Sequence, residues 1–534
     1  MAIGAPSESP AIIVKEVDLT GGVPNVQSTT GAFAGSFRWG PMEEATLVDT
    51  EATLASTFGA PDNTHAVDFH TASSFLSYAN ALQISRIADS GALNATDDSG
   101  TAALIKNNDA WDNGSWTGDV FAKHAGTLGN SLKIQVAGPV SWATAGASFQ
   151  AQFDGAPTGT ERHILVTDED GVITGTVGTV LERFSYVSSS TSATLADGST
   201  NYEKNVVNRQ SNYIRVNAAA LDSNAAISLQ SGADGTRTTG NVQTALDVFN
   251  DKDTITVDFM IAPNMANASD QQTIVNDMVV TAGTTRKDCV VITSPSSASV
   301  VGIADPVSAS VTEAASYTYS SYLFVDNNHL KVYDKYNDKY INIPAAGSTA
   351  GIMAASDANS APWFSPAGSR RGAYLGVTSL AYTPTKAQRD TLYKAGINPI
   401  ANLPGQGILL YGDKTHLNRP SAFDRINVRR LFNVVERAVS QAARNTLFEL
   451  NDEFTRAEFV NITEPFLREI KGRRGITDFR VVCDETNNTP AVIDRNEFIA
   501  NIFIKPARSI NYITLNFVAV RSGVDFEEVA GLSV

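Results

Sequence analysis

Residues 254–293 read TITVDFMIAPNMANASDQQTIVNDMVVTAGTTRKDCVVIT, and this stretch sets the fold class. Its beginning, TITVDFMIAP, and its end, KDCVVIT, are rich in β-branched and apolar residues, which is typical of strands. Between them, QQTIVNDMVVTAG has the apolar spacing of an amphipathic helix that ends at Gly283. A strand, a helix and a strand of this length predict two parallel strands joined by a crossover helix.

The same order of elements is expected near the N-terminus. The pattern predicts a strand at 31–37, a short helix at 50–58 closed by Gly59, a helix at 68–80 and a strand at 81–88. We therefore expect a middle α/β domain with a partly parallel sheet, formed by residues 21–95 together with 245–385.

Between these two stretches, residues 96–244 shift toward Ser, Thr, Gly, Ala and Asn. Their strand signals are short and bounded by turns, and Asp170-Gly171 is a strong hairpin signal. This composition predicts a mainly-β insertion in the α/β domain. A second hairpin is expected at 321–334, turning at Asn327-Asn328.

The last 150 residues have the most regular pattern, and we expect residues 386–534 to form a C-terminal domain. A helix is predicted at 383–396, with Thr383 as N-cap. Residues 421–424 fit a capping box that opens a long helix. In a second helical stretch, Pro465 predicts either a kink or the start of a new helix. Three strands are then expected, at 479–484, 498–506 and 511–520.

Composition excludes several classes of protein. The chain has 534 residues, 43% of them apolar and 18% charged, which argues against wholesale disorder. No run approaches the roughly 18 apolar residues of a membrane helix, and the N-terminus lacks a secretory signal pattern. Two distant cysteines exclude a disulfide framework and favour a reducing compartment.

The charge is unevenly distributed along the chain. Residues 416–534 carry 16 basic and 16 acidic side chains, so the whole net charge of −16 lies in residues 1–415. An acidic surface repels phosphate backbones, so nucleic-acid binding is not expected. Lys471, Arg473 and Arg474 form the densest basic cluster. They fit either a helix C-terminus that complements the helix dipole or a contact with a partner.

Signatures of catalysis are weak. Gly407–Thr415 resembles a phosphate-binding loop, but Asp413 separates Gly412 from Lys414, where Lys should follow the glycine directly. The alternative is a strand and a turn. Residues 168–171 resemble the start of a calcium loop, but Ile173 occupies the position that requires Gly, which favours a solvated turn. We expect no catalytic site, no metal and no cofactor.

Without an evident active site, the chain resembles an assembly subunit. An apolar β-prone segment lies near each end, AIIVKEV (11–17) and NYITLNFVAV (511–520). The first has no obvious hairpin partner nearby, so it must find its backbone hydrogen bonds elsewhere. Donation of such a strand to the sheet of a neighbour is a direct way to link subunits.

Several stretches, in order, resemble the tail sheath proteins of contractile-tailed bacteriophages. They include IIVKEVDLTGGVPNVQSTTGAFAGSFRWGP (12–41), DFHTASSFLSYANALQISRIAD (68–89), the paired helices at 421–474 and VVCDETNNTPAVIDRNEFIANIFIKPARSINYITLNFVAV (481–520). The chain departs from the family at Gly126-Thr-Leu-Gly129, where a Gly-Thr-Trp-Gly-like segment is usual. The resemblance covers nearly the whole chain.

The resemblance implies a structural polymer: hexameric rings stacked around a tail tube, which contract to drive the tube through the host envelope. It implies an N-terminal arm (1–20) and a C-terminal arm (about 511–534) that exchange strands with neighbours. The expected interface residues are Ile12, Ile13, Val14, Val17, Ile513, Leu515, Phe517 and Phe526, with hinges at Gly21, Gly22 and Gly523. The implied fold is multidomain, α/β and α+β. Its conserved core, the C-terminal α/β domain at 386–534 completed by the N-terminal arm, would lie near the tube, with the mainly-β insertion outward.

The implied partners are other copies of the chain, the tail tube protein, and the baseplate and tail-terminator or neck proteins. Neither nucleic acid nor a membrane is expected as a direct partner. The implied location is the virion tail, assembled in the host cytoplasm. Two alternatives stay open: the sheath of a phage-derived contractile injection system, and a nucleotide-binding enzyme that uses Gly407–Thr415.

Overall fold

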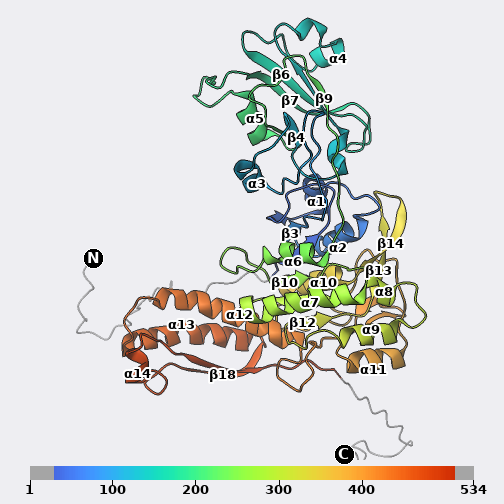
Figure 1. Ribbon diagram of the computed structural model, residues 1–534. Coiled ribbons are helices and arrows are strands. Elements are labelled where there is room, and N and C mark those ends of the chain that lie inside the picture. Colours follow the sequence, from blue (N-terminus) through green and yellow to red (C-terminus); the bar gives the residue numbers. More distant parts are fainter. Residues whose placement is uncertain (1–28, 512–534) are drawn as a thin grey trace, which may run out of the picture.

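The computed structural model describes residues 29–511. Figure 1 shows three parts. A β-rich part stands away from a central sheet covered by helices, and two long helices with a β ribbon lie on the opposite side of that sheet. Within the described residues, no helix has the length and apolar character needed to cross a membrane.

The central sheet has six strands in the order β12-β11-β10-β1-β3-β2. They are β1 (Gly31–Gly35), β2 (Ala45–Val48), β3 (Leu82–Arg86), β10 (Phe259–Ile261), β11 (Val290–Thr293) and β12 (Leu323–Val325). All neighbouring strands are parallel except β2, which runs antiparallel to β3. The prediction of a partly parallel sheet is therefore confirmed.

Helices cover both faces of this sheet (Figure 1). One face carries α1 (Glu51–Phe58), α2 (Ala66–Leu76) and α10 (Ala346–Asn359), and the other carries α6 (Thr239–Asp247), α7 (Ala268–Val280), α9 (Pro306–Ala314) and α11 (Lys386–Lys394). Phe33 of β1 enters the first core, whereas Ala32 and Ala34 enter the second, because alternate residues of a strand face opposite sides. The helix predicted at 50–58 is confirmed, with Thr50 as its N-cap.

Between β3 and α6 the chain forms a β-rich part with its own core. Its strands are β4 (Val120–Ala122), β5 (Leu132–Ala137), β6 (Glu161–Asp168), β7 (Thr179–Ser188), β8 (Ile214–Val216) and β9 (Ala226–Ser228). The predicted hairpin around Asp170-Gly171 is present as β6 and β7. Its connection is the longer loop 169–178, in which the Asp168 carboxylate accepts the amides of Ile173 and Thr174.

The hairpin predicted at 321–334 is wrong. Strand β12 pairs in parallel with β11, whereas β13 (His329–Asp334) pairs with β14 (Lys339–Pro344) in a different sheet. The two asparagines between β12 and β13 are fully buried, and the Asn327 side chain accepts the amide of Ile400. Their buried side chains therefore fix the chain where it passes from the central sheet to the sheet of β13 and β14. No exposed hairpin turn forms there.

The C-terminal part has two long helices, α12 (Ile426–Ala443) and α13 (Glu453–Gly472), that lie side by side. It continues as a two-stranded antiparallel ribbon of β18 (Ile476–Val482) and β19 (Asn501–Pro506). A small core, which includes Leu431, Leu467 and Trp363, joins these elements. Two of the three predicted strands are thus confirmed, and the third, at 511–520, lies outside the described residues apart from its first residue.

Three predicted helix boundaries differ from the structure. Helix α11 follows Thr385, which forms a capping box with Gln388, so Thr383 is not the N-cap. Residues 421–424 do not cap α12, because the Thr415 amide bonds to the Asp424 carbonyl and holds them in a turn before the helix. Pro465 lies within the single helix α13, so the prediction of a new helix there is wrong.

The segment before α12 contributes side chains to both cores of the central sheet. Leu392 and Ile397 belong to one core of the central sheet, and Ile400 and Leu410 belong to the other. The remaining elements are α3 (Asn108–Asn113), α4 (Ala147–Gln150), α5 (Glu203–Gln210), α8 (Ser297–Val300), α14 (Pro490–Ile493), β15 (Ser379–Leu380), β16 (Ile400–Leu403) and β17 (Gly407–Leu410), with short helical turns η1 (Thr127–Ser131), η2 (Trp142–Thr144), η3 (Thr281–Arg286) and η4 (Arg444–Thr446). Helix α7 was predicted to end at Gly283. It ends at Val280, and the helical turn η3 continues past Gly283 to Arg286.

Candidate interaction surfaces

Most of the predicted interface residues lie outside the described residues. This holds for Ile12, Ile13, Val14, Val17, Gly21 and Gly22 near the N-terminus, and for Ile513, Leu515, Phe517, Gly523 and Phe526 near the C-terminus. Their roles stay predictions. The structure does describe the two points from which these segments depart, Thr29 and Asn511, and the ribbon that precedes the second point.

The basic cluster lies at the C-terminal end of α13. Lys471 pairs with Asp478 at 3.0 Å and Arg473 pairs with Glu469 at 3.4 Å, both on the surface. Arg474 has a φ of +67° just after the helix C-cap, a place that glycine usually takes. The sequence predicts one basic cluster of three cations. In the structure, two of them pair with acidic side chains of the same chain.

The ribbon presents unpaired backbone at its outer edges. Within residues 29–511, β18 and β19 pair with each other and with no further strand. Their inner side chains, including Ile502 and Ile504, pack on the C-terminal core, whereas Phe503 points outward and is 58% exposed. Such an edge is a template for the addition of strands from another chain.

An apolar loop joins α12 to α13, and the sequence reasoning missed it. The exposed fractions of the loop side chains Leu447, Phe448 and Leu450, and of Phe454 in the first turn of α13, lie between 62% and 103%. Phe448 also has a φ of +72°, a strained conformation for a bulky residue. A cluster of exposed apolar side chains marks a contact surface. The signal in the sequence was LFEL inside a helix–helix connection, where polar residues are usual.

The segment 407–415 is a strand and a turn. Strand β17 pairs with β16, so its backbone amides belong to a ladder and do not form a phosphate nest. Lys414 donates to the Tyr393 carbonyl at 2.8 Å, and its ammonium lies 4.0 Å from the centre of the Tyr393 ring. The strand-and-turn alternative is therefore confirmed.

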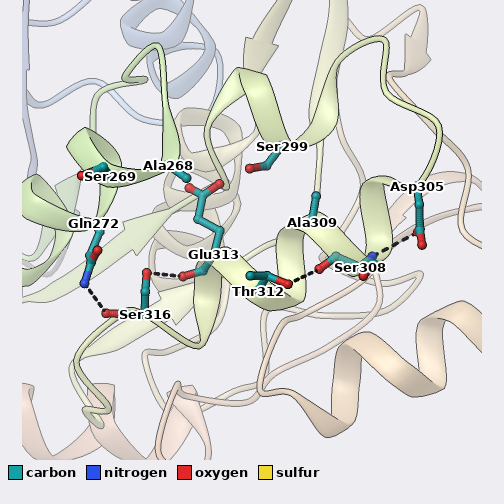
Figure 2. A pocket seen from close by; sticks show the side chains of 10 residues that line it. All are labelled: Ala268, Ser269, Gln272, Ser299, Asp305, Ser308, Ala309, Thr312, Glu313 and Ser316. Atoms are coloured by element: carbon teal, nitrogen blue, oxygen red, sulfur yellow. Dashed lines mark hydrogen bonds between the residues drawn. The ribbon is translucent and has the colours of Figure 1, made fainter.

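Figure 2 shows a surface hollow of about 650 Å³ lined by α7, α8 and α9. Most of the side chains around it are Ala, Ser and Thr. Its two carboxylates both serve the fold. Asp305 accepts the Ser308 amide and caps α9, and Glu313 accepts hydrogen bonds from Ser296 and Tyr317. The hollow thus offers methyl and hydroxyl groups and suits a packing contact better than chemistry.

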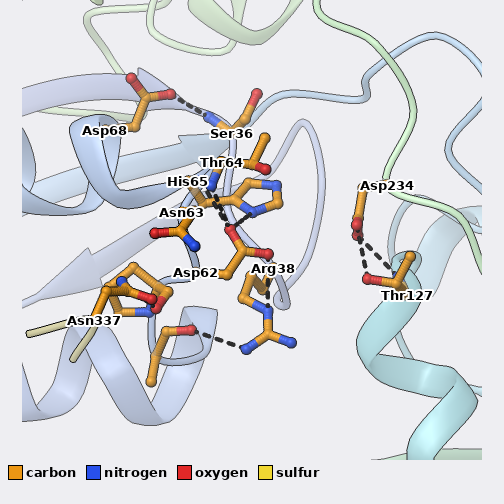
Figure 3. A network of polar contacts seen from close by, with 12 residues as sticks. Ser36, Arg38, Asp62, Asn63, Thr64, His65, Asp68, Thr127, Asp234 and Asn337 are labelled. Carbon is orange, nitrogen blue, oxygen red and sulfur yellow. Dashed lines mark hydrogen bonds and ion pairs between the residues drawn. The ribbon is translucent and has the colours of Figure 1, made fainter. Parts of the chain in front are cut away.

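Figure 3 shows a polar network where the β-rich part meets the central sheet. Asp68 accepts the Ser36 amide at 2.8 Å and pairs with Arg237. Burial lowers the pKa of Arg237 to about 10, although the guanidinium stays charged at neutral pH. On the side of the β-rich part, the Thr127 hydroxyl donates to Asp234 at 2.7 Å. The Arg237–Asp68 pair thus joins the end of the β-rich part to α2, whereas the Thr127–Asp234 bond is a separate contact within the β-rich part.

The partly exposed Asp62 and the buried His65 form another part of the polar contacts in Figure 3. His65 bonds to Asp62 through its ring at 2.8 Å and through its amide at 3.0 Å. Partial burial opposes ionisation of Asp62, but these hydrogen bonds outweigh it and hold the pKa of the carboxyl well below its usual range. Among residues 29–511, no group of three or more His, Cys, Asp and Glu side chains is arranged to hold a metal ion.

Two family models match the chain. The model of the phage tail sheath protein central domain matches residues 235–416, and the model of the phage tail sheath C-terminal domain matches residues 418–519. The boundary between the two matches, at residue 417, lies before α12 begins at Ile426.

Curated relatives match the chain from end to end. The tail sheath protein of Vibrio phage KVP40 is 32% identical over 98% of this chain and 99% of its own length. The tail sheath protein of Salmonella phage ViI is 31% identical over 99% of this chain and 98% of its own length. That of Enterobacteria phage T4 is 46% identical over 55% of this chain and 47% of its own length.

Solved structures share the fold at low identity. The sheath tail protein from Listeria innocua has a TM-score of 0.59 and 13% identity, and the match covers 91% of this chain and 93% of the other. The helical sheath of the anti-feeding prophage in its contracted state has a TM-score of 0.54 and 12% identity, with 96% and 99% covered.

Proposed function

This chain belongs to the phage tail sheath family, and on that premise we propose that it polymerises as stacked six-membered rings around a tail tube and contracts to drive the tube through the host envelope. The observation that carries the proposal is the pair of virion relatives that match at 31–32% identity over 98–99% of the chain. Both are structural tail sheath proteins, so the proposed role is mechanical and not enzymatic.

Strand exchange is the proposed link between subunits. The open edges of the ribbon support it, because each edge offers backbone groups to an incoming strand. The N-terminal segment around Ile12–Val17 of one neighbour and the segment around Ile513–Phe517 of another would add to the ribbon. Gly21, Gly22 and Gly523 would absorb the changes in backbone angle while subunits rotate as rigid bodies.

The C-terminal part is the proposed inner layer, close to the tube, and the β-rich part would face outward. We place its start near residue 417 in place of 386, because residues 386–416 contribute to the cores of the central sheet. The remaining proposed parts are an arm at 1–20, a middle α/β domain from 21–95 and 245 onward, and the insertion at 96–244.

Lys471, Arg473 and Arg474 are proposed to contact an acidic surface on the tube or on a neighbouring subunit. Replacement of all three by Gln is expected to weaken co-assembly on tubes, more strongly at low salt, where surface charges are screened less. Unchanged co-assembly at low ionic strength would reject this contact. Baseplate and neck proteins are the other proposed partners, and the virion tail is the proposed location, after assembly in the host cytoplasm.

A contractile injection system is the second candidate. Its support is the fold shared with the anti-feeding prophage sheath, at 12% identity. The end-to-end relatives from phages favour the virion. Genes for capsid and packaging proteins beside the coding sequence would decide for the virion.

Electron microscopy of the purified chain tests the proposal. We expect hollow tubes from the intact chain, and their loss after deletion of residues 1–20. A control replaces the exposed Val172 and Val177, in the loop between β6 and β7, by Ser, which should leave tubes intact. Monodisperse particles at high concentration, with and without tube protein, would contradict a sheath function.

A further inference from the structure

Helix α12 is joined to the central sheet through arginines. Arg430, Arg437 and Arg444 follow at seven-residue intervals, which places them on one face of the helix. Arg430 pairs with Asp357, Arg437 with Asp258 and Arg444 with Asp253. Arg425, the N-cap of the same helix, pairs with Asp413.

The Arg437 pair holds the point where the described chain begins. Asp258 is 8% exposed and receives Arg437 at 2.6 Å on one carboxylate oxygen. Its other oxygen accepts the amide of Thr30 at 3.0 Å. The Thr30 carbonyl in turn accepts the amides of Asp258 and Phe259. Arg437 also donates to the carbonyls of Val257 and Asp288, so one guanidinium binds two strands of the sheet and supports Thr30.

The Arg425 pair holds the point where the described chain ends. Asp413 is 4% exposed and receives Arg425 at 2.9 Å. The same carboxylate accepts the Ser509 hydroxyl at 2.8 Å and the Asn511 amide group at 3.2 Å. The Tyr393 hydroxyl accepts from both Arg425, at 2.6 Å, and Asn511, at 3.0 Å. The chain that leaves the ribbon is therefore fastened to α11 and to the turn after β17, beside the start of α12.

We propose that Arg425 and Arg437 are positioning residues: through Asp413 and Asp258, they make α12 the rigid bar that fixes where the two linking segments leave the subunit. This rests on the proposed function, in which those segments join neighbours. The two arginines are twelve residues apart on the helix, which is about 18 Å at roughly 1.5 Å per residue. A force from one linked neighbour to the other passes along α12 and bypasses the core of the sheet.

The burial of both carboxylates is what makes the bar rigid. Burial opposes ionisation of Asp258 and raises its pKa, while Arg437 opposes that effect. Removal of one partner of a buried pair leaves the other charge uncompensated, so such pairs hold one geometry. Arg444 is the natural control on the same helix, because it and Asp253 are each 66% exposed and such a surface pair contributes little.

Hydrogen exchange of the full-length chain tests the N-terminal anchor. In Arg437→Gln, the Asp258 carboxylate that accepts the Thr30 amide loses its cation, and we expect exchange of that amide to rise at least about tenfold. Arg444→Gln should leave it unchanged. Equal protection of Thr30 in Arg437→Gln and the parent chain would overturn the role of Arg437.

Limited trypsin cleavage after Arg508 tests the C-terminal anchor, because Arg508 is exposed next to Ser509. Tyr393→Phe removes only a hydroxyl and should fold normally, so it keeps the test decisive if Arg425→Gln does not fold. We expect cleavage to rise at least about fivefold in Tyr393→Phe and in Arg425→Gln. Cleavage at the parental rate in both variants would overturn the role of Arg425.

Cryo-electron microscopy of assembled tubes then tests the coupling. Arg425→Gln and Arg437→Gln are expected to give few tubes or tubes of variable helical twist, whereas Arg444→Gln retains the parental rise and twist. If exchange at Thr30 and cleavage after Arg508 rise while the tubes keep the parental helical rise and twist, the proposal is wrong. A parent chain that forms no tubes would count against the proposed function, and the exchange and cleavage results alone would then decide whether the arginines hold the chain.

Discussion

The central sheet and the C-terminal part differ in how completely they bury their apolar side chains. The sheet has an apolar core on each face, with Phe33, Phe69 and Phe324 fully buried. The C-terminal part has one small core, an exposed apolar loop at 447–454 and a ribbon with open edges. The first region is complete within one chain. The second, within residues 29–511, leaves apolar side chains and strand edges exposed, and in a polymer such surfaces are the sites of assembly.

The strongest test of this contrast compares two phenylalanines. Phe33 is 0% exposed in β1 and Phe448 is 103% exposed in the apolar loop. Phe33→Ala should cost about 3–5 kcal/mol of unfolding free energy, because it opens a cavity in a packed core. Phe448→Ala should change it by less than about 0.5 kcal/mol while reducing tube formation. Urea unfolding and sedimentation of tubes measure the two effects, and equal costs for both variants would refute the contrast.

A second test uses a carboxyl group inside the sheet. Burial raises the pKa of Asp326 to about 7, above its ordinary value of 3.8. The folded chain therefore binds a proton more tightly than the unfolded chain, and stability is lost as the pH rises from about 4 to about 7. Relative to Asp326→Asn, the parent should lose up to about 1.4 kcal/mol of unfolding free energy per pH unit in this window.

Denaturant titrations of parent and variant at pH 5, 6 and 7 measure this difference. The matched change in the C-terminal part is Asp478→Asn. Lys471 lowers the pKa of this exposed carboxyl, so any stability it contributes is present at neutral pH and lost as the pH falls. A free-energy difference between parent and Asp326→Asn that stays constant with pH would contradict the buried, protonated state of Asp326.

A third test adds one methyl group in each region. A Cβ at Gly347 of α10 would lie 2.3 Å from the Thr71 carbonyl oxygen of α2, so these helices require glycine at their closest approach. Gly347→Ala should destabilise the chain by about 1–3 kcal/mol through overpacking. At Gly472 of α13 nothing lies within 4 Å, and Gly472→Ala should be neutral or gain up to about 1 kcal/mol. Thermal unfolding compares them, and a loss at both sites would contradict the packing described.

The smallest expected effect is a gain in the C-terminal part. Arg474 has a left-handed conformation that closes α13, with the Gly475 amide bonded to the Ile470 carbonyl. Arg474→Gly should stabilise the monomer by about 1 kcal/mol, because glycine takes this conformation without strain. If the cation serves a contact, the same variant should assemble less well. Improved assembly together with improved stability would show that Arg474 has no role in contact.

The sequence predicted the elements whose signals are local. The crossover unit at 254–293 has a clear change of period, and it forms β10, α7 and β11. The short helix predicted at 50–58 is present as α1, Glu51–Phe58. The hairpin at Asn327-Asn328 was wrong because the partner of β12 is β11, and no local signal reports a parallel partner that far back in the chain.

The candidate surfaces were harder to predict than the fold. Lys471, Arg473 and Arg474 were identified by their density. The Lys471–Asp478 pair depends on the turn after α13, whereas the Arg473–Glu469 pair follows the four-residue spacing of a helix. The anchors at Asp258 and Asp413 join residues more than 90 positions apart, such as Asp413 and Ser509, so no spacing pattern could reveal them. The sequence LFEL shows that the loop is apolar, but only the structure shows that these side chains are exposed and so mark a contact surface.

The most direct test of the central claim is a cryo-electron microscopy map of assembled tubes, resolved well enough to count strands in the sheet that contains β18 and β19. The account predicts additional strands beside the two-stranded ribbon, formed by residues 11–17 and 513–517 of neighbouring subunits. A ribbon that remains two-stranded in the tube, with its edges open or covered by other parts of the chain, would contradict it.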